Sequence, residues 1–146
     1  MPKTQVDTVA VADKLRPALL RVGRELRREA REVGVSPEQV SLLVTIKYAP
    51  GIGVGELAAR ERVSAPAMSN HVDRLERDGL VERTPSADDR RRVGLTLTDE
   101  GQRMLRRVRS RRTAWLASRL AGLTPDELAA VEAAVEPLSR LVEGRR

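Results

Sequence analysis

A short stretch from Ser64 to Asn70 combines residue types that can read DNA bases. It opens with Ser64, Ala65 and Pro66, and Ser69 and Asn70 follow about one helical turn later. Small side chains allow a helix to approach a surface closely, and an asparagine amide can form two hydrogen bonds with adenine in the DNA major groove. The stretch is therefore predicted to begin a helix whose outer face contacts base edges.

Arginines near this stretch suit the other part of a DNA site. Asp89, Arg90 and Arg91 belong to a polar loop that follows the predicted helix. An arginine held on a two-stranded ribbon can enter the minor groove, whose negative potential deepens where the groove narrows. A carboxylate such as Asp89 can hold a neighbouring arginine in place, either in this loop or at Arg74 on the helix. Arg90 and Arg91 are thus candidate DNA contacts.

The chain lacks the residues of several common chemistries. It has no Cys and a single His, so one copy cannot form a disulfide, a thiolate nucleophile or a zinc site of His and Cys ligands. Asp88 and Asp89 could pair as general acid and base, but no nucleophile, metal-ligand set or phosphate-binding loop accompanies them. We therefore expect no enzyme activity and no cofactor.

The base-reading stretch belongs to a pattern of two helices joined by a tight turn. Met68, Val72 and Leu75 recur on one face, which predicts an amphipathic helix over residues 64–78. A shorter helix is predicted at residues 55–60, and two brief strands at residues 80–84 and 93–98. This order is a winged helix-turn-helix, in which the second helix enters the major groove and the hairpin is the wing.

Four further helices are predicted around this module. Apolar residues recur at helical spacing over residues 11–33, and Ser36, Thr98 and Thr124 have the sequence context of helix caps. Pro17 either begins the regular part of the first helix or kinks it, and Pro137 bends or ends the last one. The long terminal helices carry apolar seams that a monomer of this size cannot cover on both sides, so a second copy is expected.

The composition limits the fold class and the partners. With 146 residues, 40% hydrophobic and only 1% aromatic, the composition favours one mainly α domain, and the two strands predicted above add a small β-hairpin wing. The net charge of +6 suits a polyanionic partner, either nucleic acid or an anionic membrane surface, and charge alone does not choose between them. No run reaches the roughly 20 apolar residues that span a bilayer, so we expect a cytoplasmic protein with no membrane partner.

Several linked motifs resemble the MarR family of bacterial transcriptional regulators. They are Gly55-Glu56-Leu57-Ala58, Val63-Ser64 with Pro66, Val72-Asp73-Arg74-Leu75-Glu76, Asp78-Gly79-Leu80-Val81-Glu82-Arg83, Asp89-Arg90-Arg91, and Leu97-Thr98 with Gly101. The resemblance covers nearly the whole chain, because the flanking helices also match in number and order. Its most specific part is the spacing between the motif around Gly79 and the Asp-Arg-Arg motif.

The resemblance implies an assembly and a function. It implies an obligate homodimer that binds a pseudo-palindromic operator in double-stranded DNA and usually represses transcription. Residues 1–35 and 99–146 would form the helical dimerisation region, and residues 36–98 the winged helix-turn-helix domain. Many members release DNA when a small, often phenolic or anionic molecule binds between the dimer helices and the winged domain, so a small-molecule effector is expected.

The resemblance also implies roles for individual residues. Those expected to face the major groove are Ser64, Pro66, Ser69 and Asn70. Arg74 would reach a phosphate or the wing carboxylate, and Asp89 and Arg91 would be the wing pair.

Two other functions fit the same residues. A winged-helix module can act as an adaptor that binds another protein and has lost affinity for DNA. It can also bind RNA or DNA without sequence preference. Preference for one duplex over a scrambled duplex at fixed salt separates a regulator from both alternatives.

Overall fold

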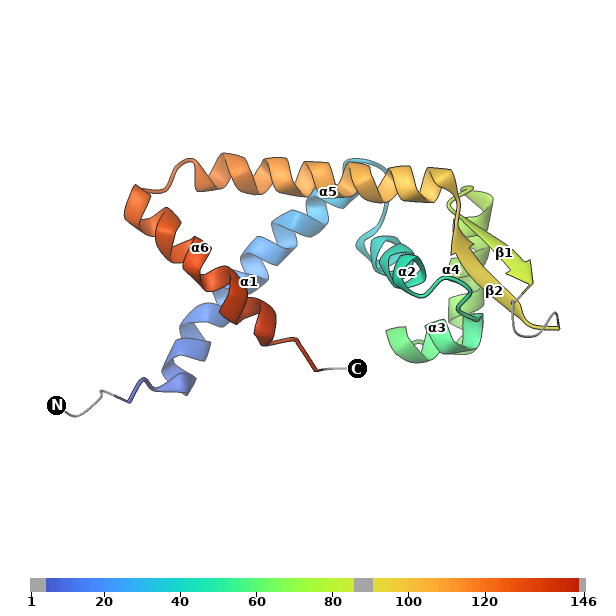
Figure 1. The fold of residues 1–146 in the computed structure, drawn as a ribbon, viewed down its shortest axis with the longest axis horizontal. Helices are drawn as coiled ribbons and strands as arrows, with labels where there is room; N and C mark the ends of the chain where they lie inside the picture. Colours follow the sequence, from blue (N-terminus) through green and yellow to red (C-terminus); the bar gives the residue numbers. More distant parts are fainter. Residues whose placement is uncertain (1–4, 86–90, 145–146) are drawn as a thin grey trace. The chain divides into compact units, whose positions relative to one another are not determined.

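The computed structural model describes residues 5–85 and 91–144 (Figure 1). The chain divides into two compact units, Met1–Arg112 and Thr113–Arg146. The described residues form α1 (Thr8–Arg31), α2 (Pro37–Tyr48), α3 (Val54–Glu61), α4 (Ala65–Arg77), β1 (Val81–Pro85), β2 (Val93–Leu97), α5 (Asp99–Leu120) and α6 (Pro125–Arg140). The mainly α fold class with one β-hairpin is confirmed. Within these residues, no helix has both the length and the apolar character needed to cross a membrane.

Reciprocal side-chain caps begin two of the helices. At the start of α2, Ser36 Oγ accepts a hydrogen bond from Gln39 N at 3.1 Å, and Gln39 Oε1 accepts one from Ser36 N at 3.0 Å. Thr124 and Glu127 repeat the arrangement at α6, at 3.2 and 2.9 Å. Each cap satisfies backbone donors that have no partner within the helix, so both helix starts follow from local sequence.

The two interior prolines do not bound their helices. Helix α1 begins at Thr8, where Asp7 Oδ1 accepts a hydrogen bond from Val9 N at 3.0 Å, so the option that Pro17 begins the helix is wrong. Helix α6 continues through Pro137 and ends at Arg140, so Pro137 does not end it. A proline inside a helix removes one backbone hydrogen bond, and the flanking turns hold both helices across that gap.

The main core of the first unit lies among α2, α3, α4 and the hairpin. Its buried residues are Leu42, Leu43, Ile46, Ile52, Leu57, Ala58, Met68, Val72, Leu75, Leu80, Val81 and Leu95. Helix α4 contributes Met68, Val72 and Leu75, the three residues predicted to share its inner face. The opposite face of α4 is consequently turned to solvent.

Helix α5 is tied to α1 by arginines within the first unit. Arg111 pairs with Glu29 at 3.1 Å, and Arg112 Nε donates to the carbonyl oxygen of Leu26 at 3.0 Å. Burial, with a smaller contribution from nearby Arg27, lowers the pKa of the Arg112 guanidinium. At the start of α5, hydrogen bonds from Arg107 and Arg103 lower the pKa of the Glu100 carboxyl.

The hairpin joins α4 through a tight turn. Gly79 has φ 73°, in the left-handed region that glycine adopts at low cost, and Leu80 N donates to the carbonyl oxygen of Leu75 at 2.9 Å. Leu80 therefore closes the helix, and β1 begins at Val81, one residue later than predicted. β1 and β2 are antiparallel, with Val81 opposite Leu97 and Pro85 opposite Val93.

Close backbone contacts fix both ends of the hairpin. A Cβ at Gly94 would lie 2.5 Å from the carbonyl oxygen of Gly51, and a Cβ at Gly101 would collide with the carbonyl oxygen of Leu80. Thr98 joins the same region, because its hydroxyl donates to the carbonyl oxygen of Gly79 and accepts from Gly101 N. The Gly94 contact sets the wing against the segment between α2 and α3, and the contacts of Gly101 and Thr98 set the start of α5 against the turn after α4.

Gly101→Ala is expected to destabilise the fold by roughly 1–3 kcal/mol, because the added methyl has no room against the backbone of Leu80. The control is Gly55→Ala in α3, where no neighbouring atom lies within 4 Å of the new Cβ. Alanine at an open helical position is neutral or stabilises by up to about 1 kcal/mol. Thermal or urea unfolding measures both variants, and equal stabilities would contradict the tight packing at Gly101.

Candidate nucleic-acid interface

Helix α4 presents the predicted base-reading residues to solvent. Ala65, Pro66 and Asn70 are exposed, and Ser69 is half-buried. Because Met68, Val72 and Leu75 are buried on the other side, the position of this polar face is determined by the core. The structure thus gathers five predicted site residues, Ser64 included, on the first half of one helix.

The start of α4 is capped by the chain itself. Ser64 Oγ accepts a hydrogen bond from Ala67 N at 3.3 Å, and Pro66 has no N–H to donate. In the first turn of α4, the backbone N–H of Ala65 is therefore the donor that takes no part in this capping. A phosphate at this helix start would meet fewer backbone donors than a helix without proline offers.

Sequence reasoning missed a side chain that joins the wing to α4. Arg83, on β1, pairs with Asp73 of α4 at 2.7 Å and with Glu76 of α4 at 3.7 Å. The pairing partly neutralises two carboxylates on a face proposed to approach polyanionic DNA, where unpaired acidic groups would be repelled. Arg83 and the two carboxylates all belong to motifs that resemble the family. Their pairing, however, depends on the hairpin folding back on α4.

Two of the four remaining predicted site residues are among the described residues. Arg74 is exposed on the last turn of α4, and Arg91 is exposed just before β2. Asp89 and Arg90 lie outside the described residues, so the predicted pair of Asp89 with Arg91 is untested. Among the described residues, no group of three or more Asp, Glu, His or Cys side chains could hold a metal ion.

The short helix α3, the tight turn, the longer α4 and the hairpin define a winged helix-turn-helix protein. Comparison with known proteins agrees with this class. The sequence model of the MarR family matches residues 35–93. An uncharacterized HTH-type transcriptional regulator of Mycobacterium bovis is 33% identical to this chain, over 91% of this chain and 93% of the relative. The chain belongs to the MarR family of transcriptional regulators, and it is not an enzyme.

Two further comparisons extend the match. The HTH-type transcriptional repressor MdtR of Bacillus subtilis is 33% identical to this chain, over 88% of this chain and 78% of MdtR. A solved structure from Pseudomonas aeruginosa is 32% identical and superposes with a TM-score of 0.80, over 97% of this chain and 99% of the other. Similarity therefore extends beyond the winged domain to the flanking helices.

Proposed function

We propose that this protein is a homodimeric repressor that binds a pseudo-palindromic operator in double-stranded DNA within the cytoplasm. Residues 36–98 form the DNA-binding domain, and residues 1–35 and 99–146 form the dimerisation region. A small-molecule effector releases the operator. The repressor role has support from MdtR, whose name describes a repressor.

The exposed face of α4 is the observation that carries the proposal. The amide of Asn70 is exposed, Ser69 lies beside it, and the small first turn allows close approach. A helix of this size fits the major groove, where each base pair presents a distinct pattern of donors and acceptors. Ser64, Ala65, Pro66, Ser69 and Asn70 are therefore assigned to the major groove.

The wing supplies the cations of the proposed interface. Arg91 is exposed where the chain enters β2, and Arg90 and Asp89 precede it in the sequence. A guanidinium at this place can enter the minor groove next to the major groove that α4 occupies. Arg74, exposed on α4, is assigned to a phosphate.

Uncovered apolar side chains support the dimer. Helix α6 buries none of its residues, and Leu128, Val131 and Val135 recur on one face with exposures of 42%, 43% and 59%. Helix α1 likewise exposes Leu19 and Val22. Contiguous apolar surface of this kind is rarely left in water, and a second copy of the same chain offers matching seams.

A gel-shift titration tests the function directly. The full-length protein is titrated against the DNA upstream of its own gene and against a scrambled duplex of equal composition, at one salt concentration. A regulator prefers the upstream DNA by about a thousand-fold or more. Equal affinities would favour nonspecific binding of nucleic acid, and no binding at all would favour a protein-binding adaptor.

Arg83→Gln is expected to weaken operator binding about ten-fold while unfolding stability changes little, because exposed ion pairs contribute about 0–1 kcal/mol to folding. The cause would be two α4 carboxylates left unpaired beside phosphates. Adding Asp73→Asn should then restore part of the affinity, since it removes one of those charges. Arg60→Gln, which breaks the exposed Arg60–Glu56 pair of α3, is the matched control. A double variant as weak as Arg83→Gln would contradict this role.

A further inference from the structure

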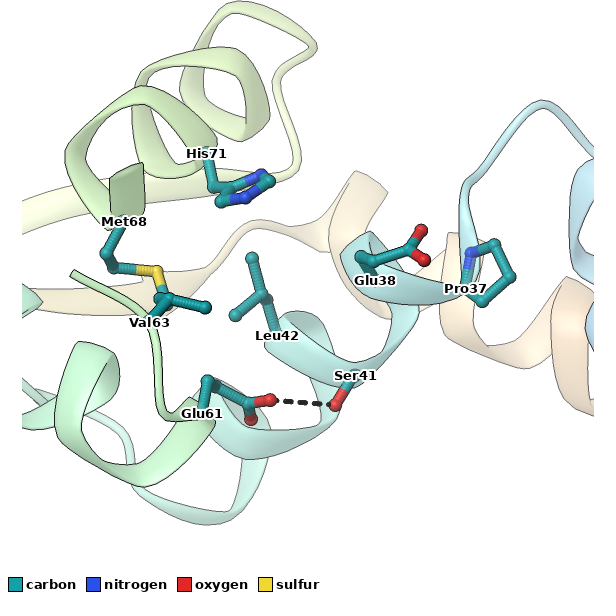
Figure 2. Close-up of a pocket in the computed structure, with 8 residues that line it drawn as sticks. All are labelled: Pro37, Glu38, Ser41, Leu42, Glu61, Val63, Met68 and His71. Carbon is teal, nitrogen blue, oxygen red and sulfur yellow. Dashed lines mark hydrogen bonds between the residues drawn. The ribbon is translucent and has the colours of Figure 1, made fainter. Parts of the chain in front are cut away.

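A cavity of about 310 Å³ lies beside α4, within the first unit. Figure 2 shows its walls: the start of α2, the turn after α3, and α4. Leu42 and Met68 are buried and, with Val63, give it an apolar wall, and the His71 ring borders it from α4 (Figure 2). The volume suits a small organic molecule.

The polar lining of this cavity is acidic. Glu61 is half-buried, and both of its carboxylate oxygens accept a hydrogen bond: Oε2 from Ser41 Oγ at 3.1 Å and Oε1 from Thr45 Oγ1 at 2.7 Å. These hydroxyls hold the carboxylate at the wall, as Figure 2 shows for Ser41. Each carboxylate oxygen can accept a second hydrogen bond, so the group retains capacity for a ligand.

Among the described residues, no lysine or arginine lines the cavity to balance this charge, and its one nitrogen-bearing side chain is the imidazole of His71. The eight lining residues include Glu38 and Glu61 and no lysine or arginine. Within the described ranges, neither carboxylate is part of a salt bridge. A carboxylate that is half removed from water gains from a cation brought close to it, whereas an anion here would meet two negative charges.

We propose that this cavity binds a small organic cation, an ammonium group joined to an apolar body. The ammonium pairs with Glu61, Glu38 lies at the exposed side, and the apolar body packs on Leu42, Val63 and Met68. This deepens the proposed function, because it gives the effector a charge and a place. Both differ from the expectation of an anionic or phenolic molecule between the dimer helices and the winged domain.

The cavity can influence DNA binding because α4 is one of its walls. Met68 and His71 line it, and Ser69 and Asn70 lie between them on the same helix. A ligand held between α2 and α4 favours one spacing of these two helices. If the spacing between α2 and α4 differs between the free and the DNA-bound protein, the ligand therefore changes the position in which α4 holds Asn70 toward DNA.

Isothermal titration calorimetry of the full-length protein without DNA tests the proposal, at about pH 8, where an alkylammonium is charged. The probes are 2-phenylethylammonium and 3-phenylpropionate, which have similar size and opposite charge. We expect the cation to bind at least about ten-fold more tightly than the anion. Glu61→Gln should weaken the cation about ten-fold or more. Glu56→Gln removes the same charge from the exposed face of α3, outside the cavity, and should leave affinity within about two-fold.

A second measurement does not depend on any variant. His71 is the only histidine of the chain, so its imidazole NMR signals need no assignment. Saturable shifts of these signals with 2-phenylethylammonium would place the ligand at the cavity. Absence of saturable binding, preference for the anion, or an unmoved His71 signal would each overturn the proposal. Because DNA is absent, these results stand apart from the gel shift that tests the repressor function.

Discussion

The double variant Val131→Asp/Val135→Asp is expected to sediment as a monomer and to lose about a hundred-fold or more in operator affinity. Both valines lie on the uncovered apolar face of α6. A carboxylate there would be buried without a partner in a dimer, which costs several kcal/mol per charge. The loss in DNA affinity follows because a monomer binds one half-site, without the effective concentration that a linked second domain provides.

The matched control is Ala129→Asp/Ala133→Asp, which adds the same charges to the same helix. Ala133 is exposed and lies about 160° around the helix from both valines. This control should remain dimeric and bind the operator nearly as well as the unchanged protein. Sedimentation velocity and a fluorescence-anisotropy titration provide the two readouts. A Val131→Asp/Val135→Asp dimer of normal affinity would place the dimer interface elsewhere.

Arg91→Ala is expected to weaken operator binding by about ten-fold or more at physiological salt, and to do so for all duplex sequences alike. Each guanidinium that leaves the DNA reduces the counterions released on binding. Two wings per dimer therefore make the slope of log K against log salt shallower by about two.

Arg140→Ala, at the end of α6, makes the same change of charge at a residue that is not assigned to the DNA interface. It should leave the salt slope of operator binding unchanged. Anisotropy titrations at several salt concentrations compare the two variants. If the salt slope of the Arg91→Ala variant equals that of the unchanged protein, Arg91 does not contact the DNA.

The local elements of this fold could be predicted because short-range chemistry determines them. Ser36 with Gln39 and Thr124 with Glu127 form closed caps within four residues, and Gly79 provides the left-handed turn after α4. The buried face of α4 followed from the spacing of its apolar residues. These features require no knowledge of distant parts of the chain.

Features that depend on the chain folding back were beyond the sequence. Arg83 meets Asp73 only because β1 turns along α4, and Glu61 meets Ser41 and Thr45 only because α3 packs near α2. The apolar repeat indicated the first helix only from residue 11 and left the role of Pro17 open, because the cap by Asp7, which begins α1 at Thr8, lies outside that repeat. The negative charge of the cavity beside α4 likewise comes from two separate elements, with Glu38 on α2 and Glu61 on α3, and no sequence motif predicts it.

Chemical footprinting on an operator selected from random duplexes tests the central claim most directly. Dimethyl sulfate probes the major groove, and hydroxyl radicals probe the sugars that line the minor groove. Two major-groove protections centred about one helical turn, or 10 base pairs, apart are expected, each with a minor-groove protection beside it. Asn70→Ala should relax base preference within both major-groove protections. A single protected patch, or protection without any major-groove contact, would contradict the placement of α4 and the wing on DNA.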